Sequence, residues 1–199
     1  MDNSRFQTQE RFHIRQKVTF AVNRYVVTTE EPDGSEGEVV AFAQQKRLAF
    51  KEQVTCYTDE SRQRVLCSFK ARKILDLGTV YDVTDEAGDV IGSFRKKFAA
   101  SLLRSTWQLE QPGRAELTGL ERSRFVAVLR RVWGVIPFTD LLPFAWPYHF
   151  DFTLGGRQVL SVDKKFGLRD RYVLEVASPD VDRRLAIAQA VALDALQDR

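Results

Sequence analysis

The chain is poor in the residue types on which most catalytic and metal sites depend. Its 199 residues include only two histidines and two cysteines. It has no Gly-x-x-x-x-Gly-Lys phosphate loop, no Gly-x-Ser-x-Gly nucleophile turn and no His-Glu-x-x-His zinc motif. The spacing of the histidines and cysteines matches no familiar zinc pattern. We therefore expect a protein that is not an enzyme and that carries no metal and no cofactor.

The sequence also contains no pattern that predicts a targeting or membrane-spanning segment. A secretory signal needs a charged end followed by about 7–15 apolar residues, and residues 1–6 contain no apolar run. The long apolar stretch 185–196 would rise about 18 Å as a helix, which is short of the roughly 30 Å hydrocarbon layer. We expect no transmembrane segment and a cytoplasmic location, with peripheral attachment to a membrane as an open alternative.

A four-residue pattern, aromatic, any residue, apolar, Thr, recurs along the chain and predicts repeated β-hairpins. The clear copies are Tyr25–Thr28, Tyr81–Thr84 and Phe150–Thr153, with a looser copy at Thr55–Thr58. Turn-forming residues follow each copy, and a pair of apolar residues comes next. These pairs are Val39-Val40, Val65-Leu66, Val90-Ile91 and Val159-Leu160. We expect Tyr81 to be equivalent to Phe150, and Val90 to be equivalent to Val159.

The only cysteines, Cys56 and Cys67, flank the turn of the second hairpin. Intracellular cysteines are usually reduced and behave as small apolar side chains, which is the reading that we favour here. A redox pair across the hairpin is the alternative.

Residues from about 121 to 149 break the strand pattern. Apolar residues at helical spacing within 121–133 predict a short amphipathic helix. Three prolines then interrupt an apolar stretch, which is expected to lie extended over other apolar groups. The stretch either contacts a membrane or a partner, or it closes one end of the fold. The candidate contact residues are Arg130, Arg131, Phe138, Leu142, Phe144 and Trp146.

The C-terminal segment predicts a core helix over residues 179–197. Ser178 and Pro179 have the character of a helix start. Within 185–196 only Gln189 and Asp194 are polar, and a helix that is apolar on all sides must be buried on all sides. In a chain that otherwise reads as β-strands, such a thin, alanine-rich helix fits best inside a closed barrel.

In the order of these units the chain resembles the LURP-one-related proteins of the tubby C-terminal-like superfamily, which includes relatives of phospholipid scramblases. The resemblance covers about Phe12 to Leu196 and rests on the terminal helix and on four segments. These are Tyr81–Thr84, Val90–Lys97, Ser101–Trp107 and Phe150–Thr153. It implies a mainly β, single-domain fold over residues 1–199, a closed antiparallel barrel of about twelve strands threaded by the C-terminal helix. Members of the superfamily bind phosphoinositides or associate with membranes. The tubby phosphoinositide-binding residues match no positions here, and the calcium-binding and cysteine-rich segments of scramblases have no visible counterpart.

Basic residues recur just after the apolar pair of each repeat, whereas most of the hairpin turns are acidic. In an antiparallel barrel this predicts one basic rim and one more acidic rim. The candidate ligand-binding residues are Arg72, Lys73, Arg95, Lys96, Lys97, Lys164 and Lys165. The alternative is that these charges only solvate the strand ends and keep the protein soluble.

These features favour a non-catalytic binding module for anionic phospholipid or another amphiphile at a membrane surface. A structural or protein-interaction domain that uses the apolar 134–148 segment is the alternative, and scramblase-like or enzymatic activity is third. We expect no nucleic acid partner, because the net charge is only +3. The oligomeric state is left open.

Overall fold

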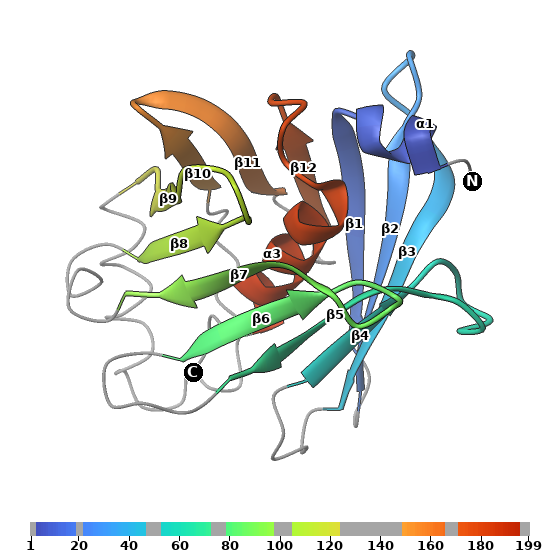
Figure 1. Ribbon diagram of the computed structural model, residues 1–199. Helices are drawn as coiled ribbons and strands as arrows, with labels where there is room; N and C mark the ends of the chain where they lie inside the picture. The colour runs from blue at the N-terminus through green and yellow to red at the C-terminus, as the bar shows by residue number, and fades with distance from the viewer. Residues whose placement is uncertain are drawn as a thin grey trace, which may run out of the picture.

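The computed structural model describes residues 3–18, 22–46, 53–72, 79–97, 105–123, 149–165 and 171–195. Twelve antiparallel strands form a closed barrel in which each strand pairs with its neighbours in sequence, and β1 pairs with β12 to close it (Figure 1). The strands are β1 (Arg11–Val18), β2 (Val22–Glu30), β3 (Glu36–Lys46), β4 (Gln53–Tyr57), β5 (Val65–Ala71), β6 (Val80–Thr84), β7 (Val90–Lys96), β8 (Thr106–Glu110), β9 (Leu117–Glu121), β10 (His149–Leu154), β11 (Arg157–Lys165) and β12 (Arg171–Val176). The described helices are α1 (Asn3–Thr8) and α3 (Arg183–Ala195). The predicted closed barrel with a C-terminal core helix is confirmed.

The first strand of each repeated hairpin carries a β-bulge. The strand register shifts just after the third residue of the repeat in β2, β6 and β10, and just after the second residue of the looser copy Thr55–Thr58 in β4. A bulge bends its strand and increases the local twist, so four bulges spaced around the sheet help it to curl and close. The residues before the four shifts are Val27, Cys56, Val83 and Phe152.

The predicted equivalence of the third and fourth repeats holds in one strand and fails in the other. Tyr81 and Phe150 are both buried, and each is the second paired residue of its ladder. Val90, however, pairs with Thr84, whereas the partner of Thr153 is Gln158. The turn that follows Thr84 is one residue longer than the turn that follows Thr153. The prediction that pairs Val90 with Val159 is therefore wrong by one residue, and Val90 is 54% exposed while Val159 is 2% exposed.

Helix α3 lies inside the ring of strands (Figure 1) and is buried around its whole circumference. Leu185, Ile187, Val191 and Leu193 are all at most 1% exposed, as predicted, and Leu196 lies outside the described residues. Alanines and barrel glycines give the helix room. A Cβ atom at Gly92 would lie 2.6 Å from Leu185 Cδ2, so this position needs the smallest residue for the helix to fit.

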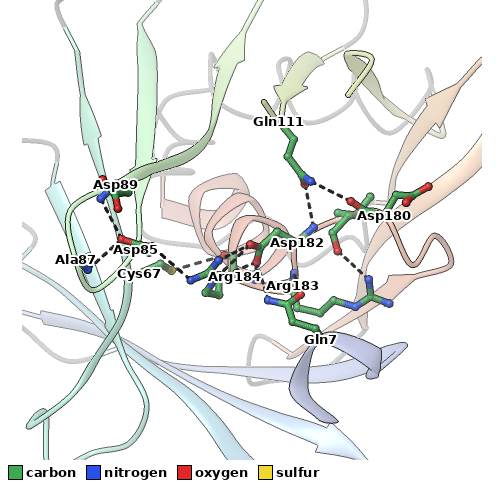
Figure 2. Close-up of polar contacts among 11 residues, drawn as sticks. Gln7, Cys67, Asp85, Ala87, Asp89, Gln111, Asp180, Asp182, Arg183 and Arg184 are labelled. Atoms are coloured by element: carbon green, nitrogen blue, oxygen red, sulfur yellow. Dashed lines mark hydrogen bonds and ion pairs between the residues drawn. The ribbon is translucent and has the colours of Figure 1, made fainter. Parts of the chain in front are cut away.

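The start of α3 corrects the sequence prediction. The helix begins at Arg183, and its N-cap is Asp182, not Ser178. The Asp182 carboxylate accepts the backbone N–H of Arg184 at 2.8 Å, and its carbonyl accepts the N–H of Ala186 at 3.0 Å. Figure 2 shows Gln7, Gln111 and Arg184 converging on this turn. Residues 178–181 instead form a tight turn before the helix.

Arg183 is the largest polar side chain among the buried residues that the structure describes, with 2% of its surface exposed. Its guanidinium donates hydrogen bonds of 2.8–2.9 Å to the carbonyl oxygens of Gln9, Ser178 and Val181. Burial lowers the pKa of this guanidinium, but an arginine stays charged in proteins. The side chain therefore ties the N-terminal segment and the turn before α3 to the helix itself.

Cys56 and Cys67 face each other directly across β4 and β5, and both thiols are free and fully buried. The pKa of Cys67 is raised well above its usual value. The larger cause is a hydrogen bond with the Cys56 side chain, and the smaller is burial. Since the thiolate is the reactive form, Cys67 has the character of an inert core side chain.

Several sequence predictions fall outside the described residues. They include most of the amphipathic helix expected at 121–133 and the whole of the 134–148 segment. In the predicted helix only Glu121–Ser123 are described, and Glu121 is the last residue of β9. The predicted site residues outside the described ranges are Lys73, Arg130, Arg131, Phe138, Leu142, Phe144 and Trp146.

Candidate functional site

One rim of the barrel is acidic. Because consecutive strands alternate in direction, the five hairpin turns from β2–β3 to β10–β11 and the entry to α3 all lie at this end, called here the turn rim. Asp33 and Asp59 accept hydrogen bonds from Ser35 and Ser61, and these bonds lower the pKa of both carboxyls. The acidic residues of the turn rim are Glu31, Asp33, Asp59, Glu60, Asp85, Glu86, Asp89, Asp180 and Asp182.

The opposite end, called here the basic rim, is where β1, β3, β5, β7, β9 and β11 finish. As predicted from the repeats, basic residues collect there. The described basic residues with exposed side chains at this rim are Lys17, Arg24, Lys70, Arg72, Lys97, Arg122, Lys165 and Arg171, and Arg95, Lys96 and Lys164 are partly buried. The structure thus brings six of the seven predicted ligand-binding residues to one end of the barrel.

These six residues do not share one face of the sheet. Side chains alternate between the two faces of a strand, and Phe94 and Val162 point into the core. Lys96 and Lys164 therefore face inward at the rim, while Arg95 and Lys165 face outward. Lys164 Nζ lies 5.6 Å from the centroid of the Tyr172 ring, a cation–π distance. Lys96 and Lys164 are therefore not part of an outer binding surface.

Arg72 and Arg95 line one small hollow of about 90 Å³ on the outer face of β6–β8. Carboxylates accompany both guanidinium groups. Arg72 Nε donates to Asp82 at 2.8 Å, and its hydrogen bonds and attraction to Asp82 raise its pKa. Arg95 Nη2 lies 4.0 Å from Glu110 Oε1. The positive charge of this part of the rim is therefore largely balanced.

A comparison with known protein families identifies the chain. The family model described as LURP-one-related matches residues 39–194, which is more than half of the sequence. The chain belongs to the LURP-one-related family. A search of the curated proteins found no match. The family match agrees with the resemblance carried by the repeated hairpins and the terminal helix.

This LURP-one-related protein has a polar cluster on β9–β11 that the sequence analysis missed. Arg122 Nε donates to Asp151 at 2.8 Å, and this bond raises the pKa of Arg122. His149 Nδ1 lies 2.8 Å from Asp163 Oδ1. Sequence alone gave no signal, because the residues come from three strands and meet only through the strand register. Arg122 and Asp151 thus form an ion pair between neighbouring strands, and a hydrogen bond joins His149 to Asp163.

The sequence analysis also missed the basic residues of β1, β2 and β12. Arg15, Lys17, Arg24 and Arg171 lie near the basic rim on strand faces that point outward. The comparison of repeats could not reveal them, because they do not follow an apolar pair. The alternation of buried and exposed residues in each strand is the signal that would have placed them on the outer face.

The described part of this LURP-one-related protein shows neither a metal site nor a membrane-spanning helix. Among these residues no group of three or more His, Cys, Asp or Glu side chains is arranged to hold an ion. None of the described helices is long and apolar enough to cross a bilayer.

Proposed function

We propose that the protein is a non-catalytic binding module for anionic phospholipid, or another anionic amphiphile, at a membrane surface. The observation that supports the proposal is the separation of charge along the barrel axis, with a basic rim opposite an acidic one. Such a molecule has an electrostatic polarity, so an anionic surface attracts one end and repels the other. The acidic turns would orient the barrel with its basic rim toward the headgroups.

The closed topology weakens the simplest structural explanation for the basic residues. Charged side chains often protect the exposed edges of a sheet from pairing with other chains. This barrel has no edge strand, since β1 and β12 pair with each other. Edge protection therefore does not require charges here. Solubility alone does not explain why acidic residues predominate at one end and basic residues at the other.

Vesicle co-sedimentation tests the proposal. Each Lys or Arg near an anionic membrane contributes about 1 kcal/mol of attraction. Replacing Arg72, Lys97, Lys165 and Arg171 with Gln is expected to weaken binding to vesicles rich in anionic lipid by more than about tenfold. Binding of the unaltered protein is expected to fall steeply as salt is added, because salt screens exposed charges.

The matched control removes the same number of positive charges from the turn-rim half of the barrel. Arg62, Arg64, Arg114 and Arg157 are replaced with Gln, and binding is expected to be unchanged or tighter. If the unaltered protein does not bind anionic vesicles at low salt, the proposal is wrong. Equal weakening by the two fourfold variants would mean that only net charge matters and that the rim has no specific role.

A further inference from the structure

The strand register brings basic residues directly opposite one another on four adjacent strands. Lys165 of β11 is paired with Arg171 of β12, and Arg171 is paired with Arg15 of β1. Two residues further along β1, Lys17 is paired with Arg24 of β2. All five side chains are exposed and lie on the outer face of the barrel near the basic rim. We call these five residues the β11–β2 basic patch.

Few carboxylates accompany this patch. Arg15 forms an ion pair with Glu36, with Nη2 and Oε2 2.5 Å apart. Among the described residues, the other four patch members have no ion pair. The hollow on β6–β8 is different, because Asp82 and Glu110 accompany its two arginines. Of these two parts of the basic rim, the β11–β2 patch therefore carries the larger unbalanced positive charge.

This arrangement works against the stability of the sheet. Like charges directly opposite each other on neighbouring strands are destabilising, whereas opposite charges in the same places would stabilise. The fold itself gains nothing from the three like-charged pairs. The presence of residues that lower the stability of the free protein is explained when a bound partner supplies the missing negative charge.

We propose that the β11–β2 basic patch is the surface by which the barrel docks on an anionic phospholipid bilayer. This inference rests on the proposed function and specifies which part of the rim makes the contact. A bilayer fits better than a nucleic acid, because none of the exposed residues described on these four strands is aromatic and so no base-stacking platform is present. The patch also lies toward the basic rim, where a flat charged surface can reach the four side chains that have no ion pair among the described residues, Lys17, Arg24, Lys165 and Arg171.

Two triple variants with equal charge change test the proposal. The first replaces Lys17, Arg24 and Arg171 with Gln, and the second replaces Arg72, Arg95 and Lys97 with Gln. Binding to vesicles of phosphatidylglycerol and phosphatidylcholine is measured by co-sedimentation at several salt concentrations. The first variant is expected to bind between about tenfold and about a hundredfold more weakly, with a shallower salt dependence, and the second only slightly more weakly.

Thermal unfolding provides a second readout that a purely structural role would not give. Because the first variant removes three like-charged contacts, its unfolding midpoint is expected to rise by about 2 °C or more. Together, a higher midpoint and weaker vesicle binding identify a surface kept for binding at a cost in stability. A lower midpoint would contradict the like-charge argument and overturn the proposal.

The remaining outcomes separate this inference from the proposed function. If the second variant loses binding and the first does not, the docking surface lies on β5–β8 and the inference alone is wrong. If neither variant nor the unaltered protein binds vesicles, the proposed function fails as well. Tighter binding to a single-stranded RNA than to vesicles, lost in the first variant, would overturn the membrane assignment of the patch.

Discussion

Arg183 offers the strongest test of how the turn-rim end of the barrel, where α3 begins, is held together. Replacing it with Met keeps most of the side-chain volume but removes every donor. The carbonyl oxygens of Gln9, Ser178 and Val181, at 2.8–2.9 Å from the guanidinium, would then lose a charged hydrogen-bond donor. Only 2% of the Arg183 surface is exposed, so water has little access to replace it.

The expected loss follows from two opposing effects. Each buried carbonyl left without a partner costs about 1–3 kcal/mol. Against this, Met avoids the cost of burying a charge, which amounts to several kcal/mol. The hydrogen bonds outweigh burial because all three come from one fixed guanidinium, and we expect a net loss of about 3 kcal/mol in the free energy of unfolding.

Urea unfolding followed by circular dichroism measures this loss. The control is Arg114→Met, which removes an exposed arginine whose partner is Asp180 at 2.8 Å and should cost at most about 1 kcal/mol. If Arg183→Met costs less than about 1 kcal/mol, the guanidinium does not hold the turn-rim end together. The segments around Gln9 and Ser178 would then owe their positions to apolar packing and to their other hydrogen bonds, such as that of Gln9 Nε2 to the Glu30 carbonyl.

Two further changes probe the barrel interior and the helix cap. In Gly119→Ala the new Cβ would lie 2.4 Å from Phe152 Cε1, so overpacking should lower the free energy of unfolding by about 1–3 kcal/mol; an unchanged urea midpoint would contradict close packing there. Burial opposes the ionisation of Asp182, but hydrogen bonds from Arg184 and Gln7 outweigh it and lower its pKa. A lowered pKa contributes stability above the unfolded value of about 3.9 that is lost as pH falls through the folded value. Acid should therefore lower the free energy of unfolding of the unaltered protein more than that of Asp182→Asn. Equal losses in the two proteins, measured by urea titration below about pH 4, would contradict this.

The repeated hairpins could be read from the sequence because their pattern reflects packing. An aromatic residue and an apolar residue two positions later both face the core, as Phe150 and Phe152 do. The second strand of the hairpin was aligned one residue out of register in the prediction that matches Val90 with Val159. The cause is that the turn after Thr84 and the turn after Thr153 differ in length. In a sequence comparison, a pair of adjacent apolar residues can be aligned in either of two registers. In the sheet, a one-residue shift moves every side chain to the other face.

The helix was predicted correctly, but its first residue was not. Ser178 and Asp182 are both good N-cap residues, and Pro179 favoured the earlier start. The structure uses Asp182, because its carboxylate reaches the N–H of Arg184 and also binds Gln7, which comes from the other end of the chain. A contact between residues 175 positions apart in sequence leaves no local signal.

The candidate site shows the same division between local pattern and tertiary arrangement. The basic rim was predictable, since it follows from where charges fall in each repeat. The separation of Lys96 and Lys164 from their outward neighbours depends on which residues face the core. The pairing of Arg171 with both Lys165 and Arg15 depends on the register across the closing strands. Neither property can be read from one strand alone.

Closure of the barrel fixes which residues of the first and last strands lie opposite one another. Strands β1 and β12 come from opposite ends of the chain, and their pairing places Arg15 beside Arg171. The same pairing buries Phe12 against the interior next to Leu174, so the fold cannot avoid bringing the two strands together. It could avoid placing two arginines opposite each other, because outward positions tolerate most polar residues at little cost. The barrel therefore does not impose arginine at both positions. Arg15 gains an ion pair with Glu36, and for Arg171 we propose that the gain is binding to an anionic surface.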